Sequence, residues 1–408
     1  MKNRHIERVW LAQAFADDLV LVYPVYAIMM LDQGVGAFDL TVLFVIWSAS
    51  SLVFEIPSGV VGDLVDRRVY LFAGSLIRAS GYLTWWLLPT FPGFAFGFLL
   101  WSLGSAIHSG TLQSLLYDVL AEQGRTADFT RIYGRGQALN TLGVLVAMAL
   151  GGFVAESGYT AVLLLSAVAP VASGALIAGC VREPARTHVE KGESSPTFST
   201  TLVSAVLALR QNRSLRRVSI MFVGLVALFG TIDEFPGALL EDLNQGPAQG
   251  MLSLGVIGVL YGAFLGSQSI GAALAHRFRV MPARRIAMVS LLAHGILLGG
   301  LAAGMWAGWP GGGVLLCVGV AAYFGIMGVV EVLLETSLQH EIDSGARATI
   351  TSVSGAAMEL CAIVLYLVIG ATAATAGWSA ALAVVAMIAV LLSLAFAYSA
   401  PTAARSRS

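Results

Sequence analysis

The sequence predicts an all-α membrane protein, in which twelve transmembrane helices form two six-helix bundles around a central cavity. Its composition is the first observation: of 408 residues, 57% are hydrophobic and 12% are charged, with a mean hydropathy of +0.80. Such values exclude an ordinary soluble domain. The second observation is a recurrence of apolar stretches of about 20 residues, the length that crosses a bilayer. The third is an internal repeat.

Twelve apolar stretches are candidates for transmembrane helices. They cover residues 9–31, 41–62, 69–89, 93–117, 137–157, 159–181, 217–240, 251–275, 285–306, 313–338, 349–375 and 378–399. Basic residues precede the first stretch, as in a signal peptide. That stretch is too long for a signal peptide, however, and it contains Asp17 and Asp18, so we expect a retained helix.

These stretches divide the chain into two bundles and a linker. We expect residues 1–181 to form an N-terminal six-helix bundle and residues 217–408 to form a C-terminal one. Residues 182–216 are expected to form a linker in the cytoplasm. Its first part is polar and rich in Ser, Thr and Pro, and the part that follows is expected to form an amphipathic helix on the inner membrane surface.

The basic residues predict the orientation of the helices. Of the 23 Lys and Arg residues, all but Arg78 lie at the termini or in every second gap between the apolar stretches. The intervening gaps contain Asp and Glu but no Lys or Arg. By the positive-inside rule, the basic gaps and both termini are expected to be cytoplasmic. The expected location is therefore a membrane that borders the cytoplasm.

An internal repeat relates the two bundles. The segments YPVYAIMMLDQG (23–34) and FPGALLEDLNQG (235–246) align at an offset of 212 residues, which pairs Pro24 with Pro236. Other residues share the offset: Gly59 pairs with Gly271, and Arg67 pairs with Arg279. Parallel repeats of six helices are typical of transporters with a mid-membrane cavity. Pro24 and Pro236 are expected either to act as hinges or simply to shape helix packing.

The gap after the second stretch contains a spaced motif. In FEIPSGVVGDLVDRRVYL (54–71), Gly59 and Asp63 are followed by Arg67 and Arg68 at regular spacing. This pattern resembles the signature loop of the major facilitator superfamily, and the twelve spans, the repeat and the linker extend the resemblance over the whole chain. The resemblance implies that these four residues act in conformational gating. Asp66 stands where the family usually has Gly, and the alternative is that Arg67 and Arg68 only determine topology.

Two further segments bear on a bacterial efflux-like subgroup of the family. The segments SGTLQSLLYDVL and FTRIYGRGQALN resemble this subgroup, which implies the inner membrane of a bacterium as the location. Its proton-exchanging exporters have a Gly-Pro step in the fifth span, which is missing here. The corresponding positions are occupied by Gly143, Ala147, Met148, Gly151 and Gly152. The fourth span lacks the Arg typical of proton-coupled members, and Arg78 in the third span is a candidate substitute.

Charged residues within the apolar stretches are the candidates for the site. Each costs about 2.5 to 3.5 kcal/mol at mid-membrane and therefore needs a partner, water or a proton. The expected residues for binding substrate or protons are Asp17, Asp18, Arg78, Asp233, Glu234 and Glu359. At 1.5 Å per residue, Asp17, Asp18, Arg78 and Glu359 lie near mid-depth, and Asp17 and Asp18 are expected to point in different directions.

Other interpretations of the charges stay open. Asp233 and Glu234 suit an outer gate or entry site, while Arg78 could pair with one acid for structure alone. Glu55, Glu331 and Glu335 could cap helix ends. A metal site from Glu331, Glu335 and either His108 or His340 is disfavoured, so we expect no metal and no cofactor. We expect His294 to make a structural hydrogen bond, and the aromatic residues to line a site or lie at membrane interfaces.

These observations predict a secondary active transporter. We expect proton-coupled efflux of small amphipathic or cationic molecules by alternating access, with Asp17, Asp18 or Glu359 exchanging a proton for substrate. The alternatives are proton-coupled uptake of a metabolite and, more remotely, a membrane-embedded enzyme or sensor. No Ser-His-Asp set or phosphate-binding loop supports an enzyme. The expected partners are a small-molecule substrate, protons and the lipid bilayer, without nucleic acid, for a protein that acts as a monomer.

Overall fold

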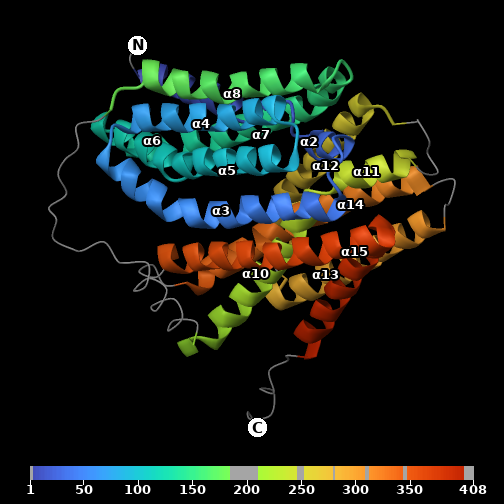
Figure 1. Ribbon diagram of the computed structural model, residues 1–408. Helices are drawn as coiled ribbons and strands as arrows, with labels where there is room; N and C mark the ends of the chain where they lie inside the picture. The colour runs from blue at the N-terminus through green and yellow to red at the C-terminus, as the bar shows by residue number, and fades with distance from the viewer. Residues whose placement is uncertain are drawn as a thin grey trace, which may run out of the picture. The chain divides into compact units, whose positions relative to one another are not determined.

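A computed structural model describes residues 3–183, 210–245, 252–278, 281–307, 312–342 and 347–398. Within these ranges the regular elements are α-helices and two short 3-10 helices, without a strand (Figure 1). Nine of the described helices are long and apolar enough to cross a membrane. The prediction of an all-α chain is therefore confirmed, and each of the twelve expected spans overlaps a described helix.

The chain folds into two compact units. Unit 1 contains residues 1–193 and 250–262, and unit 2 contains residues 194–249 and 263–408. The expected boundaries at residues 181 and 217 stay a prediction. Most of the expected linker and amphipathic helix lies outside the described residues.

Unit 1 is built around helix α4. Its elements are α1 (Asn3–Asp17), α2 (Tyr26–Asp32), α3 (Ala37–Leu64), α4 (Arg67–Leu87), α5 (Phe91–His108), α6 (Thr111–Glu122), η1 (Thr126–Asp128), α7 (Phe129–Ala155), α8 (Tyr159–Cys180) and the first part of α12 (Leu254–Leu274). Helix α4 packs against α5 and α8, while α1 packs against α7 and α8. Residues of α1, α4, α5, α7 and α8 are thereby brought close to one another.

Two glycines allow the close helix approaches on which the site depends. A Cβ atom added to Gly104 of α5 would lie 2.6 Å from the carbonyl oxygen of Gly74 and 2.4 Å from Cγ of Arg78, both on α4. A Cβ atom on Gly143 of α7 would lie 2.3 Å from the carbonyl oxygen of Phe15 on α1. Small residues of this kind let membrane helices pack backbone to backbone.

Two of the expected continuous spans of unit 1 are interrupted. Helix α1 ends at Asp17 and α2 begins at Tyr26, and α5 ends at His108 before α6 begins at Thr111. Gly110 permits the second break because its φ is +69°, a value that favours glycine. Uninterrupted helices were the wrong expectation here, because turns and a left-handed glycine end each helix early. As a result, Asp17 and His108 are the last residues of their helices.

Unit 2 repeats this feature. Its elements are α10 (Arg213–Asp233), α11 (Pro236–Gln245), the rest of α12, η2 (Ala275–Phe278), α13 (Ala283–Trp306), α14 (Gly312–Glu341) and α15 (Arg347–Tyr398). Helix α10 ends at Asp233, and Pro236, which has no backbone N–H to continue a helix, begins α11. Gly377, with a φ of 84°, divides α15 into two helices that match the last two expected spans.

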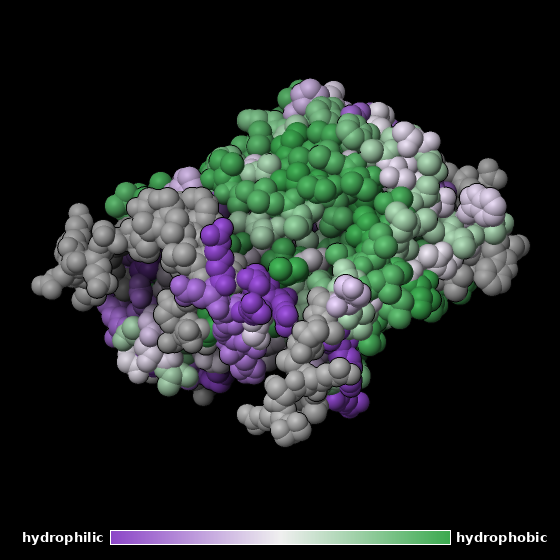
Figure 2. Space-filling model, turned by 90° about the horizontal axis from the view of Figure 1, so that it is seen from below, coloured by the Kyte–Doolittle hydropathy of each residue, from purple (hydrophilic) through white to green (hydrophobic). Residues whose placement is uncertain are grey.

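The exposed surface suits a bilayer. Figure 2 shows a continuous hydrophobic surface over part of the face that it displays. Large apolar side chains are exposed on both units, among them Val53, Phe96, Ile270 and Val364. A soluble monomer rarely exposes so much apolar surface, so the surface supports the prediction of a membrane-embedded chain.

Candidate functional site

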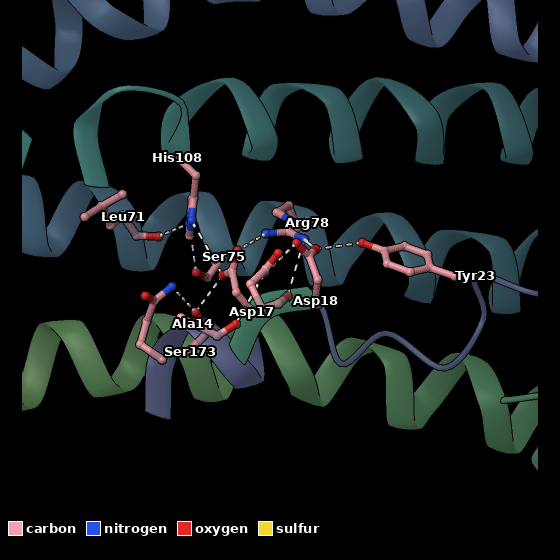
Figure 3. Close-up of polar contacts among 11 residues, drawn as sticks. Ala14, Asp17, Asp18, Tyr23, Leu71, Ser75, Arg78, His108 and Ser173 are labelled. Atoms are coloured by element: carbon pink, nitrogen blue, oxygen red, sulfur yellow. Dashed lines mark hydrogen bonds and ion pairs between the residues drawn. The ribbon is translucent and has the colours of Figure 1, made fainter. Parts of the chain in front are cut away.

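Arg78 lies at the centre of the candidate site in unit 1. Its side chain is 4% exposed and forms ion pairs with Asp17, the last residue of α1, and with Asp18, which follows it (Figure 3). Nη1 donates to Oδ2 of Asp17 at 3.1 Å, and Nη2 donates to Oδ1 of Asp18 at 2.8 Å. The two acids were expected to diverge as on a continuous helix. They converge on one guanidinium instead, because α1 ends at Asp17.

The two carboxylates differ in their other contacts. Oδ1 of Asp17 accepts a hydrogen bond from Ser173 of α8 at 2.6 Å. Asp18 accepts one from the hydroxyl of Tyr23 at 2.8 Å and one from the amide of Asn140 on α7 at 3.0 Å. The side chain of Asp18 is 28% exposed and that of Asp17 is 14% exposed. Asp18 is therefore the more accessible of the two.

His108 adds a third titratable group that was not predicted for this site. Its Nε2 lies 3.0 Å from the carbonyl oxygen of Leu71, and since a carbonyl can only accept, we assign the hydrogen to Nε2. Nδ1 then carries a lone pair in the neutral ring. It lies 3.7 Å from Oδ1 of Asp17 and has no hydrogen-bond partner among the described residues.

This pairing has a direct chemical consequence. Two lone pairs that face each other repel, and a proton placed on either atom converts the repulsion into attraction. Asp17 and His108 can therefore hold one additional proton between them. The His108 side chain is 9% exposed, so little water competes for that proton.

An aromatic wall, defined as Tyr23, Trp47 and Trp101, lies beside Asp18. Tyr23 stacks on Trp101 with ring centroids 5.5 Å apart and an interplanar angle of 14°, and Trp47 lies 5.9 Å from Trp101. All three side chains are partly exposed. Behind them, Tyr82 and Trp85 are buried. The sequence predicted that aromatic residues line a site or lie at membrane interfaces, but it could not separate the residues of the wall from those of the core.

The remaining predicted acids gather in unit 2. Tyr366 of α15 interacts electrostatically with Asp233, Glu234 and Glu359. Asp233 also interacts with Glu331 of α14, and Glu331 accepts a hydrogen bond from Gln268 at 3.4 Å. Of the six predicted residues, three thus lie in unit 1 and three in unit 2.

The other polar side chains of the spans have structural contacts. Nδ1 of His294, which is fully buried, donates to the carbonyl oxygen of Ser290 at 2.6 Å, as expected for a structural histidine. Glu335 accepts a hydrogen bond from Gln339 at 2.7 Å, and Glu55 accepts one from Ser109 at 2.8 Å. Among the described residues, no three His, Cys, Asp or Glu side chains are placed to hold a metal ion.

The predicted gating motif forms an ion-pair network at the start of α4. Arg67 pairs with Asp118 of α6 at 2.7 Å and with Glu183 at 2.9 Å. Arg68 pairs with Asp66 at 2.8 Å and donates to the carbonyl oxygen of Val181 at 3.0 Å. These contacts connect the start of α4 with α6 and with the residues that follow α8.

The other positions of this segment named by the sequence are Asp66, Gly59 and Asp63. Asp66 caps α4 by accepting hydrogen bonds from the backbone of Arg68 and Val69, and the Arg68 side chain lowers the pKa of this carboxyl. A Cβ on Gly59 would meet nothing within 4 Å among the described residues, so this glycine is not required there for a close helix contact. Asp63 lies in α3, and its side chain is outside the described part of the structure.

Comparisons with known proteins agree on one family. The family model described as Major Facilitator Superfamily matches residues 14–353. A search of curated proteins found no match. Among solved structures, a mutant of the nucleoside transporter NupG is similar with a TM-score of 0.81 and 15% identity, over 96% of this chain and 99% of that one.

Two other solved structures share the fold. The D-xylose-proton symporter has a TM-score of 0.69 and 14% identity, over 98% of this chain and 97% of that one. The POT family transporter PepTSo has a TM-score of 0.67 and 12% identity, over 97% of each chain. At such low identity these likenesses establish the architecture and leave the substrate open.

Proposed function

This chain belongs to the major facilitator superfamily, and from that premise we propose that it exports small cationic or amphipathic molecules in exchange for protons. Family membership makes the chain a multi-pass membrane transporter rather than an enzyme. The observation that carries the proposed coupling is the sharing of one guanidinium, that of Arg78, by the carboxylates of Asp17 and Asp18.

The charge of this group provides a mechanism of exchange. One guanidinium and two carboxylates have a net charge of −1, and an uncompensated buried charge is unfavourable. One bound proton or one cationic substrate would neutralise the group, whereas both together would overcharge it. Proton and substrate therefore compete for the same group, and this competition is the requirement for exchange in alternating access.

The contacts of the two carboxylates suggest a division of roles. Asp18 is the more exposed and adjoins the aromatic wall, where a cation gains from the ring faces of Tyr23 and Trp101. Asp17 adjoins His108, which can receive or supply a proton at Nδ1. We assign substrate to the side of Asp18 and the proton to the side of Asp17.

Other predicted residues keep supporting roles in this proposal. The network of Arg67 with Asp118 and Glu183 would steady one state of the cycle, and Pro24 and Pro236 would act as hinges beside the helix interruptions. Asp233, Glu234 and Glu359, which surround Tyr366, would form an outer gate or entry site in unit 2. The protein would work as a monomer in a bacterial inner membrane, with both termini in the cytoplasm.

A second candidate function is proton-coupled uptake of a small metabolite. The sequence feature that favours it is the missing Gly-Pro step, since Ala147 and Met148 occupy the place of the motif typical of proton-exchanging exporters. The same Arg78 group would then carry a proton together with an uncharged metabolite in one direction.

Transport in inside-out vesicles distinguishes the two candidates. Ethidium, a planar aromatic cation, is the probe, and vesicles containing the Asp18→Asn variant at equal expression are the control. Export predicts that ethidium accumulates when the lumen is acidified and that a protonophore abolishes the accumulation. Uptake symport of an uncharged metabolite predicts no movement of ethidium beyond that in the control vesicles. That result, or loss of preloaded ethidium under the same gradient, would overturn the proposed export of cations.

A further inference from the structure

A cavity of about 650 Å³ lies at the end of unit 1 where α1 and α7 begin, away from Arg78. It has no part in the proposed transport mechanism. Residues of α1, the segment around η1 and the start of α7 line it: Glu7, Arg8, Leu11, Arg125, Asp128, Arg131 and Arg135. Four arginines and two carboxylates leave this lining with an excess of two positive charges.

Ion pairs hold three of the arginines in place. Oε1 of Glu7 accepts from Arg131 at 2.9 Å and from Arg135 at 2.6 Å. Asp128 accepts from Arg125 at 2.8 Å and from Arg131 at 3.2 Å. Each carboxylate is thus shared by two guanidinium groups, which fixes their positions before any ligand arrives. Such preorganisation lowers the entropic cost of binding.

Arg8 and Arg135 have capacity left for a ligand. Among the described residues, Arg8 forms no ion pair within 4.0 Å, and Arg135 forms the single pair with Glu7. A guanidinium has five N–H donors in a planar fork that matches the oxygens of a phosphate group. Both side chains are exposed, so their remaining donors are accessible.

The start of α7 adds to the positive potential. The N-terminal end of a helix carries a partial positive charge and favours acidic residues or anions. Here Arg131 lies in the first turn of α7, a helix of 27 residues, and Arg125 precedes it. One carboxylate, Asp128, opposes them. A bound anion would offset both the dipole and the excess of arginine charge.

Topology alone does not explain this arrangement. The positive-inside rule depends on how many basic residues a loop has and places no requirement on their clustering. In unit 2, Arg284 at the start of α13 donates instead to the backbone carbonyl oxygens of Phe396 and Ala397 on α15. Arg284 is therefore used for helix packing.

We propose that this cavity binds the phosphate group of an anionic ligand, either an anionic phospholipid headgroup or a soluble phosphate compound. The volume exceeds that of a lone phosphate and falls within the range of ordinary ligand pockets. Helices α1 and α7 both begin here, at the level of a membrane surface, where basic pockets bind lipid headgroups. Leu11 supplies an apolar contact next to the charged groups.

Lipid binding to the purified full-length protein tests this proposal. Binding of fluorescent phosphatidylglycerol would be measured in detergent, with phosphatidylcholine as the neutral lipid and inorganic phosphate as the competitor. The test variants are Arg8→Gln and Arg135→Gln, which change exposed side chains. The control is Arg285→Gln, which removes an exposed arginine at the start of α13. Circular dichroism and gel filtration would establish that each variant is folded.

The proposal predicts tighter binding of phosphatidylglycerol than of phosphatidylcholine, with about a fivefold loss for each cavity arginine and no loss in the control. Competition by millimolar phosphate would identify a soluble phosphate compound as the ligand, and its absence would identify the lipid headgroup. Equal affinity for the two lipids together with no phosphate binding, or unchanged affinity in both test variants, would overturn the proposal.

Discussion

Asp17 and Asp18 share one guanidinium but differ in their other neighbours. Asp17 contacts Ser173 and His108, whereas Asp18 contacts Tyr23 and Asn140 and is twice as exposed. Equivalent contacts to Arg78 make either acid a possible proton carrier. Because their surroundings differ, we expect substitutions of the two acids to have different effects on transport. Single substitutions can therefore separate the path of the proton from that of the substrate.

Replacing Asp18 with Asn tests the substrate side. Asn keeps the size of the side chain and can still accept from Tyr23, but the Arg78 group becomes neutral and loses its attraction for a cation. A hydrogen bond to a charged group contributes about 1.5–3 kcal/mol. Loss of this interaction with the substrate predicts at least tenfold weaker transport of a cationic probe. Proton-driven accumulation measures this effect. The control is Asp39→Asn, which neutralises an exposed acid.

A wider comparison tests the coupling site itself. Unchanged transport in all three of the variants Asp17→Asn, Asp18→Asn and Glu359→Gln would rule out these carboxylates as the coupling site.

Replacing His108 with Gln tests the proton side. Gln can still donate to Leu71 but cannot carry a proton. Proton-driven transport is expected to slow by about a hundredfold, the lower range for a lost general acid or base. Exchange of substrate for substrate involves no net proton transfer and is expected to continue at the wild-type rate. Equal loss in both assays would show that His108 is only structural.

At the scale of elements, the interruptions position the chemistry. Asp17, His108 and Asp233 are each the last residue of a helix, where backbone groups lack their helical partners. Close packing of α4 with α5 then brings His108 and Arg78 to the interruption of α1. The geometry of the site therefore depends on helix ends and on glycine contacts more than on any single helix face.

Substituting Gly104 with Ala tests that dependence. The new methyl group would collide with the backbone of Gly74 and with Arg78, and overpacking of this kind costs about 1–3 kcal/mol. We expect a lower midpoint of thermal unfolding and weaker transport. The matched control is Gly134→Ala on α7, where a Cβ meets nothing within 4 Å among the described residues and Ala is expected to stabilise the helix. Equal midpoints for the two variants would contradict the packing argument.

At the scale of the whole molecule, the two units share helix interruptions at positions paired by the repeat, but they do not share the residues of the candidate site. The offset that pairs Pro24 with Pro236 pairs Asp17 with Phe229 and Arg78 with Ser290. In unit 2, Phe229 contacts His294, which donates to the carbonyl oxygen of Ser290. A phenylalanine and a serine, both in contact with a structural histidine, thus occupy the positions that pair with the buried ion pair of unit 1. The two units share helix interruptions and differ in chemistry.

The orientation of the chain is a prediction at this scale. Single cysteines would be introduced at the exposed positions Gln33 and Glu122 after replacement of Cys180, Cys317 and Cys361. A membrane-impermeant maleimide applied to intact cells is expected to label Cys at position 33, with position 122 labelled only after permeabilisation. The reverse pattern would mean that the positive-inside argument assigns the wrong face.

The sequence was most informative where the bilayer imposes strict requirements. The length of the apolar spans predicted the helices. The free-energy cost of a charge within the membrane identified Arg78, Asp17 and Asp18 as candidate site residues. The helix interruptions were missed because local turns hardly change the mean hydropathy of a span. His108 and Ser173 were missed at this site because their importance depends on which helices are neighbours, a property that spacing along the chain does not contain.

Residues 18–25, between α1 and α2, have one further consequence. Their backbone includes the amide of Val22, which donates to the hydroxyl of Ser166, and those of Tyr23 and Val25, which bond three residues back. Amides outside a regular helix exchange their hydrogens more readily than those within one. Ligand binding at Asp18 should therefore slow the deuterium uptake of this segment. Mass spectrometry can thus detect binding without a label on the ligand, and compounds can be screened before any substrate is known.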